Sequence, residues 1–133
     1  MSPPIARLDV SRVLGGKGVL FAGATGFLGK VALCMLLDRY GDALDKVHVV
    51  VRRGSSTSAE RRFYDKVVPS EPFQPLRDRL GEQGVVEWLQ RKVSILDGDI
   101  TDPDLGLTAA ELDLLAGRAH VLINCAGLVS FNP

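Results

Sequence analysis

A glycine-rich segment, Gly23 to Gly29 with the sequence GATGFLG, constrains the fold of this chain more than any other feature. It stands between an apolar run over 19–22 and a helix-like stretch over 27–39, which Gly41 is placed to end. A glycine turn that joins a buried strand to a helix brings unpaired backbone N–H groups together with the positive end of the helix dipole. The segment therefore predicts a phosphate-binding loop in a dinucleotide-binding domain.

The spacing of these glycines leaves a second interpretation open. Gly23, Gly26 and Gly29 follow the pattern G-x-x-G-x-x-G, which differs from the fingerprint G-x-G-x-x-G in its first interval. Gly26 also suits the start of a helix, and Gly29 suits close packing of a helix on a strand. Both roles are compatible with a loop that binds pyrophosphate, and the flanking strand and helix favour cofactor binding.

Three further apolar runs alternate with helix-like stretches. The run over 47–51 is continuous and β-branched, as is typical of a strand with both faces buried, and the later runs cover 93–96 and 121–123. Strands that alternate with helices in this way indicate right-handed crossovers and a parallel sheet covered on both faces.

Capping-box spacing marks the start of two helices, one beginning at Thr57 and the other at Thr108. The stretch 72–90 predicts one or two more helices, broken near Gly81 and Gly84. The connection between the second and third strands is therefore longer than a minimal crossover, which indicates a helical elaboration.

We expect an α/β fold of the Rossmann-like, doubly wound class, with a parallel sheet in the strand order 3-2-1-4. This domain covers 18–133 and follows a lead-in segment, 1–17. Four strands are few for such a sheet, so we expect it to be incomplete on its C-terminal side. The last strand is then an open edge through which the chain is expected to self-associate.

The carboxyl ends of the strands in such a sheet lie along one edge, where ligands bind next to the first strand. Four loops fall at this edge: Gly23 to Gly29, Arg52-Arg53, 97–100 and 124–127. These loops are also the chemically suggestive segments of the chain, and this coincidence favours a binding site more than any single motif does.

Arg52 and Arg53 follow the second strand, where a dinucleotide-binding fold distinguishes between the two nicotinamide cofactors. An acidic residue there accepts hydrogen bonds from the ribose 2′-hydroxyl group, whereas arginine pairs with a 2′-phosphate through charge-assisted contacts. Two arginines without a carboxylate therefore favour NADP(H). The alternative for this pair is a solvated charged loop.

Acidic and small residues follow the third and fourth strands. Asp99 is placed to accept a hydrogen bond from the adenine amino group, although Asp97 and Asp99 also suit a simple turn. Ala126 and Gly127 are small enough for a flat ring or a ribose to lie against the backbone, and they also suit a tight turn.

Composition argues against several other classes of protein. Sixteen Lys and Arg residues balance sixteen Asp and Glu residues, so charge gives no reason to expect a nucleic-acid partner. No apolar run has the length of a membrane span, and no signal peptide is evident, so we expect a cytoplasmic protein. Cys34 and Cys125 lack disulfide or zinc spacing, and His48 and His120 lack ligand-type neighbours, so no metal site is expected.

Taken together, these segments resemble the N-terminal part of an extended short-chain dehydrogenase/reductase. The resemblance is closest to fatty acyl-CoA reductases and to the thioester reductase domains of carboxylic acid reductases and peptide synthetases. It extends from about Gly18 onward and rests on five segments: Gly23 to Lys30, 49–53, 97–100, 104–107 and 124–127. The ending Phe27-Leu28-Gly29-Lys30 is more specific than the glycine spacing alone.

This resemblance implies the NADPH-binding portion of a reductase that converts an acyl thioester, such as fatty acyl-CoA, to an aldehyde or onward to an alcohol. It implies that the glycine loop holds the cofactor's pyrophosphate, that the arginines hold the 2′-phosphate, and that the later loops hold the adenine and the nicotinamide. The residues concerned are Gly23, Thr25, Gly26, Phe27, Leu28 and Gly29; Arg52 and Arg53; Asp99 and Ile100; and Cys125, Ala126 and Gly127.

Hydride delivery in that family also needs a Tyr-x-x-x-Lys pair, in which the tyrosine gives its proton to the developing alkoxide. Tyr40 and Tyr64 are followed four residues later by Leu44 and Val68, so this sequence contains no such pair and no catalytic residue is assigned. We therefore expect a portion of a longer enzyme. The alternatives are another extended reductase, a sugar-nucleotide epimerase or a non-catalytic dinucleotide-binding module.

Overall fold

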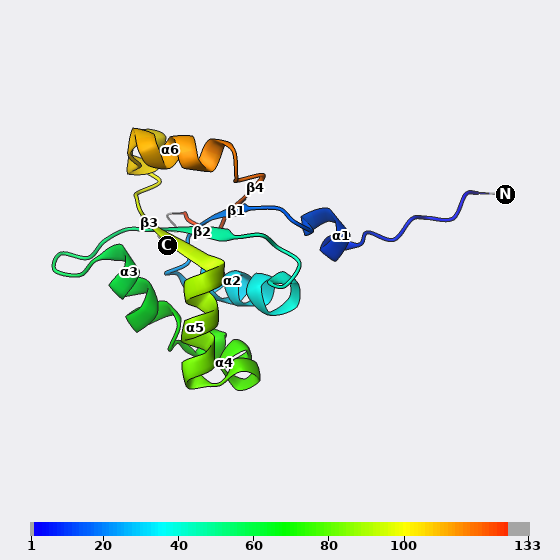
Figure 1. Cartoon of the computed structure of the whole chain (residues 1–133), viewed down its shortest axis with the longest axis horizontal. Helices are drawn as coiled ribbons and strands as arrows, with labels where there is room; N and C mark the ends of the chain where they lie inside the picture. The colour runs from blue at the N-terminus through cyan, green and yellow to red at the C-terminus, as the bar shows by residue number, and fades with distance from the viewer. Residues whose placement is uncertain (1, 128–133) are drawn as a thin grey trace, which may run out of the picture.

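A computed structural model describes residues 2–127 of the chain. Its centre is a parallel sheet of four strands in the order β3-β2-β1-β4 (Figure 1). The strands are β1 (Val19–Ala22), β2 (Val47–Val51), β3 (Val93–Asp97) and β4 (Val121–Asn124). The observed order and the parallel pairing confirm the predicted Rossmann-like α/β fold.

The strands begin level with one another. Val19 of β1 is paired with Val47 of β2 and with Val121 of β4, and Val47 is paired with Val93 of β3. All residues of β2 are buried, as its continuous β-branched run predicts. Because parallel strands run in the same direction, the loops that follow them gather at one edge of the sheet.

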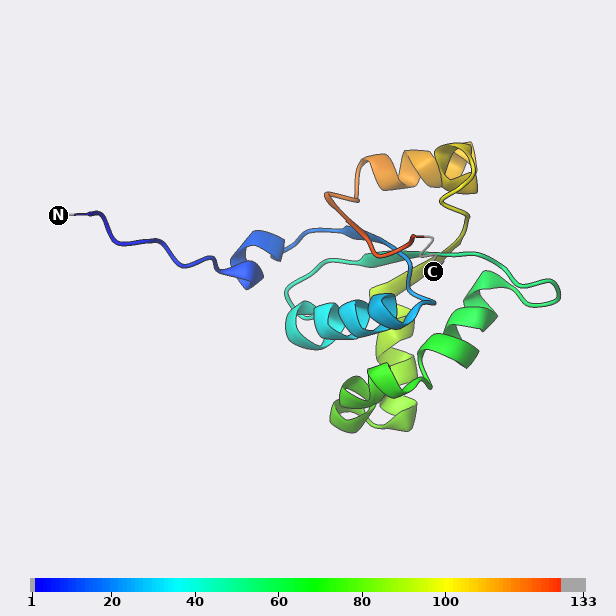
Figure 2. The ribbon, with the colours of Figure 1, turned by 180° about the vertical axis from the view of Figure 1, so that it is seen from behind.

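Helices cover both faces of the sheet, as Figures 1 and 2 show. One face carries α2 (Phe27–Tyr40) and the long connection between β2 and β3. The other face carries α6 (Ala109–Ala116), which the short 3₁₀ turn η3 (Pro103–Gly106) precedes. The long connection consists of α3 (Ala59–Arg62), the π-helix η1 (Phe63–Val67), the 3₁₀ turn η2 (Glu71–Phe73), α4 (Gln74–Leu80) and α5 (Glu82–Lys92). It is the helical elaboration that the sequence predicts.

The hydrophobic cores on the two faces differ in size. Val49 of β2 belongs to a large buried cluster that includes Leu33 of α2 and most of the buried side chains. Its neighbour Val50 points to the opposite face, as alternation along a strand requires, and belongs to a cluster of four buried residues that includes Leu115 of α6. Most of the apolar burial that stabilises the fold therefore lies on the α2 face.

The start of α3 differs from its prediction. Ser58 is the N-cap, because its hydroxyl oxygen accepts a hydrogen bond from the N–H of Arg61 at 3.1 Å. Thr57 lies in the preceding bend, where its carbonyl accepts a hydrogen bond from the N–H of Gly54 at 3.0 Å. The predicted capping box at Thr57 is therefore wrong, since a turn that joins Gly54 to Thr57 moves the helix start by one residue.

Two other local predictions have different outcomes. Thr108 forms the predicted capping box with Glu111 at the start of α6. The stretch 72–90 breaks at Gly81, where φ is +80° and α4 ends, but Gly84 lies inside α5. A break near Gly84 is therefore wrong, because one glycine with a positive φ already separates the two helices.

The lead-in segment contains a short helix that was not predicted, α1 (Val10–Leu14). Asp9 caps it by accepting a hydrogen bond from the N–H of Arg12 at 3.2 Å. Leu14 is buried in the large core cluster, so the end of the lead-in segment packs on the domain. Figure 1 shows the residues before α1 extending away from the domain.

His48 is a buried polar residue of β2. Its side chain is 2% exposed, and neither ring nitrogen has a hydrogen-bond partner among the described residues. Burial lowers the pKa of His48 below its usual value, so the imidazole is neutral and packs as an apolar group.

Several large apolar side chains remain exposed. They are Ile5, Leu8, Val13, Phe27, Leu28, Met35, Ile100, Leu114 and Leu122. Leu122 belongs to β4, at one edge of the sheet, and self-association through this edge stays a prediction.

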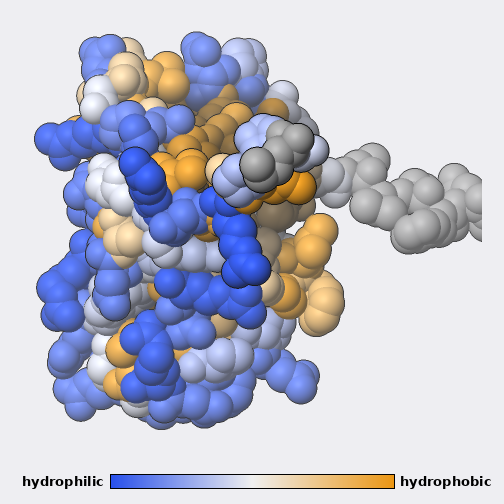
Figure 3. All heavy atoms as spheres, turned by 90° about the vertical axis from the view of Figure 1, so that its right-hand side faces the viewer, coloured by the Kyte–Doolittle hydropathy of each residue, from blue (hydrophilic) through white to orange (hydrophobic). Residues whose placement is uncertain are grey.

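Hydrophobic patches lie between hydrophilic ones on the side of the molecule shown in Figure 3. Within residues 2–127, none of the helices combines the length and the apolar character that crossing a membrane requires.

Candidate functional site

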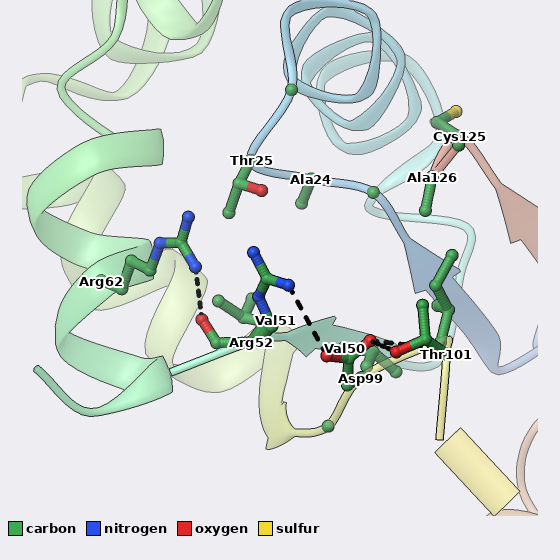
Figure 4. A pocket seen from close by; sticks show the side chains of 15 residues that line it. Ala24, Thr25, Val50, Val51, Arg52, Arg62, Asp99, Thr101, Cys125 and Ala126 are labelled. Atoms are coloured by element: carbon green, nitrogen blue, oxygen red, sulfur yellow. Dashed lines mark hydrogen bonds and ion pairs between the residues drawn. The ribbon is translucent and has the colours of Figure 1, made fainter. Parts of the chain in front are cut away.

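The loops that follow the strands surround a pocket of about 390 Å³ at the carboxyl edge of the sheet (Figure 4). All four predicted loops contribute to its wall. The predicted site residues that line it are Gly23, Thr25, Gly26, Arg52, Asp99, Ile100, Cys125, Ala126 and Gly127. Residues that line it without having been predicted are Ala24, Val50, Val51, Arg62, Gly98 and Thr101. The remaining predicted residues, Phe27, Leu28, Gly29 and Arg53, are not part of its wall.

Two glycines hold the loop after β1 against its neighbours. Gly23 has a φ of +92°, and a Cβ there would lie 2.3 Å from the backbone nitrogen of Ala126, in the loop after β4. A Cβ at Gly29 would lie 1.6 Å from the carbonyl oxygen of Gly23. The backbone of the glycine loop therefore contacts both the loop after β4 and the first turn of α2, which only residues without a side chain permit.

Gly26 is different, because a Cβ there would meet only the carbonyl oxygen of Gly23, at 4.0 Å. Its φ of −81° is open to any residue. Protein packing therefore does not require glycine at this position in the pocket wall, whereas a ligand that approaches the backbone closely does. A pyrophosphate group fits this bare stretch of backbone.

The N-terminus of α2 lies at the same part of the pocket wall, because Gly26 is its N-cap. Gly26 caps the helix without a side-chain hydrogen bond, and the N–H of Lys30 donates to the carbonyl oxygen of Gly26 at 3.0 Å. The first N–H groups of α2, before Lys30, have no carbonyl of an earlier turn as a partner, so they and the helix dipole favour an anion. Phe27 and Leu28 are 78% and 68% exposed, and because their side chains are apolar, only their backbone N–H groups can donate to an anion.

Two arginines meet at the end of β2. Arg52 Nη1 lies 3.7 Å from Oδ2 of Asp99, and Arg62, from the end of α3, donates from Nη1 to the carbonyl oxygen of Arg52 at 2.6 Å (Figure 4). The sequence reasoning missed Arg62, which follows Arg52 by ten residues. A basic residue at the end of the short helix after strand two is the signal that identifies it.

Asp99 holds the loop after β3 through its own carboxylate. Oδ1 accepts hydrogen bonds from the N–H of Thr101 at 2.9 Å and from its hydroxyl group at 2.7 Å. These two hydrogen bonds, and to a smaller extent the Arg52 guanidinium, lower the pKa of Asp99. The carboxylate is therefore charged at neutral pH. The turn that was the alternative interpretation of Asp99 is present, and Oδ2 lies toward Arg52.

Arg53 lies outside the pocket. Its Nε donates to Oδ2 of Asp97 at 2.6 Å, and its Nη2 forms an ion pair with the same oxygen. It lines a neighbouring open cavity of about 780 Å³, which we call the basic hollow. The charged residues that line the basic hollow are Arg52, Arg53, Arg61, Arg62, Asp65 and Lys66.

The loop after β4 forms the opposite wall of the pocket. The N–H of Cys125 donates to the carbonyl oxygen of Ala22 at 2.8 Å, and the N–H of Ala126 donates to Oδ1 of Asn124 at 2.9 Å. Cys125 is a half-buried free thiol, and none of the residues that line the pocket is a histidine able to activate it. This wall therefore offers small side chains against which a flat group can lie.

The pocket thus has backbone N–H donors on one wall, a guanidinium pair at the end of β2 and small residues after β4. This arrangement suits an elongated ligand with a diphosphate in its middle and a further anionic group at one end. Within residues 2–127, His, Cys, Asp and Glu side chains form no cluster of three that suits a metal ion.

Comparisons with known proteins identify the family of this chain. The model of an NAD-binding family described as male sterility protein matches residues 21–133. Fatty acyl-CoA reductase 1 of Mus musculus is 32% identical over 117 residues, which are 88% of this chain and 21% of the mouse protein. Fatty acyl-CoA reductase 1 of Arabidopsis thaliana is 31% identical over 120 residues, which are 90% of this chain and 24% of the plant protein. The chain thus spans less than a quarter of the length of these two relatives.

Two solved structures of R domains superpose on this chain. The terminal R domain from the myxalamid PKS-NRPS biosynthetic pathway superposes with a TM-score of 0.62 and 26% identity over 88% of this chain and 26% of that one. The reductase (R) domain of a non-ribosomal peptide synthetase from Mycobacterium tuberculosis superposes with a TM-score of 0.57 and 26% identity, over 90% of this chain and 27% of that one. With its family model matched from Phe21 onward and its sheet in the expected order, this chain belongs to the male sterility protein family and contains that family's Rossmann-like domain for a nicotinamide dinucleotide.

Proposed function

We propose that this chain is the NADPH-binding portion of a reductase that acts on acyl thioesters, converting fatty acyl-CoA to an aldehyde or an alcohol. The observation that carries the proposal is the meeting of the glycine loop's backbone, at Gly23 to Gly26, with the guanidinium groups of Arg52 and Arg62 around one pocket. A diphosphate and a 2′-phosphate are the two anionic groups of NADPH, and these two parts of the wall suit them.

Each group of the cofactor has a proposed place. The pyrophosphate binds the N–H groups of Thr25 to Gly29 at the start of α2. These residues follow Gly23, whose backbone lies close to that of Ala126. The adenine lies against Asp99 and Ile100, and the nicotinamide lies against the small residues of the loop after β4, Cys125 to Gly127. The nicotinamide supplies a hydride when it is bound, and the chain's own residues hold the ring and the phosphates in place.

NADPH is preferred to NADH because the site is cationic where the 2′-phosphate lies. Asp99 is the acidic residue in the pocket wall, and its carboxylate is already engaged by Thr101 and Arg52. Arg62 has no carboxylate within ion-pair distance among the described residues, so its charge is available to a ligand. Arg53, which Asp97 neutralises, contributes less to the 2′-phosphate site than Arg52 and Arg62 do.

The substrate class is inferred from the relatives. The curated relatives are named fatty acyl-CoA reductases, and the structural neighbours are R domains, one of them a reductase domain of a non-ribosomal peptide synthetase. These names support an acyl thioester over a sugar nucleotide as the substrate. Because the sequence of this chain has no Tyr-x-x-x-Lys pair, we assign it cofactor binding and no proton transfer.

Isothermal titration of the protein with NADPH and with NADH tests the proposal. We expect NADPH to bind more tightly, and Arg52→Ala to remove about tenfold or more of the NADPH affinity while leaving NADH binding nearly unchanged. Arg79→Ala is a matched control, because Arg79 forms an exposed ion pair with Asp38 at 2.7 Å away from the pocket. Equal affinity for the two cofactors, or the same loss in both arginine variants, contradicts the assignment.

A further inference from the structure

The function proposed above uses only two of the residues that line the basic hollow, Arg52 and Arg62. It has a volume of about 780 Å³ and lies beside the loop that joins β2 to α3. Five of its charged side chains are cations, namely Arg52, Arg53, Arg61, Arg62 and Lys66, and one is a carboxylate, Asp65. On a chain whose overall charge is zero, this local excess of positive charge favours an anionic group.

The basic hollow and the pocket share two of these cations. Arg52 and Arg62 line both cavities, whereas Arg53 and Arg61 do not line the pocket. Arg53 and Arg61 form ion pairs with Asp97 and Asp65. An anionic group that enters the basic hollow therefore reaches the same two guanidinium groups that we assign to the cofactor's 2′-phosphate. We therefore expect an anion bound in one cavity to compete with an anion bound in the other.

The loop beside the basic hollow carries four hydroxyl side chains, of which one is suitably placed. Ser55 is exposed and lines the hollow. Ser56 is exposed but lines only a smaller neighbouring cavity, and Thr57 is partly buried. Ser58 is used as the N-cap of α3. Ser55 is therefore the hydroxyl group of this loop that is both open to solvent and part of the hollow.

Ser55 also has the sequence context of a kinase acceptor. Protein kinases select substrates by charge pattern, and those that prefer basic substrates pair their acidic pockets with arginines two and three residues before the acceptor serine. Arg53 and Arg52 occupy these positions, and their side chains are 71% and 69% exposed. Residues 55–57 form a bend outside any helix or strand, which makes the acceptor accessible.

We propose that Ser55 is a phosphorylation site whose phosphate binds Arg52 and Arg62 in place of the cofactor's 2′-phosphate. This inference rests on the proposed function, since the competition requires these arginines to bind NADPH. A phosphoserine carries a charge of about −1.5 to −2 and three acceptor oxygens, which matches a ribose phosphate. Because it is tethered to the same loop, it competes at a high effective concentration. Phosphorylation therefore weakens NADPH binding.

The modification itself is an ordinary phosphoryl transfer from ATP held by a protein kinase. Oγ of Ser55 attacks the γ-phosphorus, and the new Oγ–P bond forms as the bond from phosphorus to the β,γ-bridging oxygen breaks. The hydroxyl proton passes to the catalytic base of the kinase, and ADP leaves. Nothing is oxidised or reduced.

The first arm of the test is modification. The protein is incubated with ATP and the catalytic subunit of the cyclic-AMP-dependent protein kinase, and the modified residue is identified by mass spectrometry. We expect phosphate on Ser55, none on the Ser55→Ala variant and unchanged modification of the matched variant Ser56→Ala. Phosphate only on other residues, or none at all, overturns the inference.

The second arm measures competition with two probes that differ by one phosphate group. Calorimetry with 2′,5′-ADP and with 5′-AMP is carried out before and after phosphorylation, and we expect phosphorylation to weaken 2′,5′-ADP binding by about tenfold or more and 5′-AMP binding much less. A preference for 2′,5′-ADP that survives phosphorylation overturns the inference alone. Equal affinity of the unmodified protein for the two probes instead overturns the proposed NADPH preference, and the competition with it.

Discussion

The glycine loop after β1 and the charged loops after β2 and β3 form two walls of one pocket by opposite means. The first wall is backbone, fixed by contacts that leave no room for a Cβ at Gly23 or Gly29. The second consists of long side chains, among them Arg52, whose side chain is 69% exposed and 3.7 Å from its partner carboxylate. In the function proposed above, the first wall sets where a phosphate lies, while the second sets which cofactor is preferred.

This difference has a physical basis. Backbone N–H groups at a helix start are held by the fold itself, so a substitution there changes packing before it changes charge. Exposed ion pairs contribute little to stability, so the charged wall tolerates substitution and reports mainly on ligand binding. Substitutions in the two walls should therefore separate stability from cofactor choice.

The largest effect is expected for Gly29→Ala. A Cβ at this position would lie 1.6 Å from the carbonyl oxygen of Gly23 and 3.2 Å from Cα of Ala24, so the backbone of β1 or α2 must shift. We expect the free energy of unfolding to fall by about 1–3 kcal/mol or more, as overpacking does. Chemical denaturation measures this change, and binding of both NADPH and NADH should weaken together.

Gly26→Ala is the matched variant, because a Cβ there meets no atom closer than 4.0 Å. Its stability should stay close to that of the original protein, while its affinity for both cofactors falls. If Gly26→Ala lowers the free energy of unfolding as much as Gly29→Ala does, any added side chain in this loop destabilises the fold. Glycine at position 26 would then be required by packing and not by a ligand.

The next effect concerns the charged wall. Arg62→Ala should weaken NADPH binding by about tenfold, because a charged hydrogen bond to the 2′-phosphate is lost, and should leave NADH binding and stability nearly unchanged. Titration calorimetry with both cofactors measures the ratio. An Arg62→Ala variant that retains the full preference for NADPH would show that its hydrogen bond to the carbonyl oxygen of Arg52 is merely structural.

A smaller effect, of opposite sign, is expected for Asp99→Asn. Asparagine keeps an oxygen acceptor for Thr101 but removes the negative charge beside Arg52 and the 2′-phosphate, so the ratio of NADPH to NADH affinity should rise about threefold. Because the pKa of Asp99 is lowered, acid within the usual working range does not neutralise this carboxylate, and substitution is the way to remove its charge. A falling ratio would show instead that Asp99 serves to hold Arg52 in place.

The smallest effect is expected for Arg53→Ala. Asp97 neutralises Arg53, which lies outside the pocket wall, so NADPH affinity should change by less than about twofold. Measured beside Arg62→Ala in the same titrations, this variant tests whether position in the pocket or mere presence of positive charge decides cofactor preference. Equal losses in the two variants would mean that the arginines attract the 2′-phosphate through their summed charge and not through individual contacts.

Local patterns predicted the elements well where the signal lies within a few residues. The continuous apolar run predicted β2, the capping box at Thr108 predicted α6, and the glycine segment predicted the junction of β1 and α2. The prediction failed at Thr57, where two neighbouring hydroxyl residues competed for the cap and a turn at Gly54 decided between them. Such a choice depends on the path of the loop, which short sequence patterns do not contain.

The sequence by itself determined the strand order, the glycine loop and the chemical types gathered at the carboxyl edge of the sheet, because periodicity, turn residues and crossover handedness are local or general rules. Only the tertiary structure decided that Arg62 reaches the end of β2, that Asp99 pairs with Arg52, and that Arg53 turns away to Asp97. These contacts join side chains from different elements, and their partners follow from how the helices pack on the sheet.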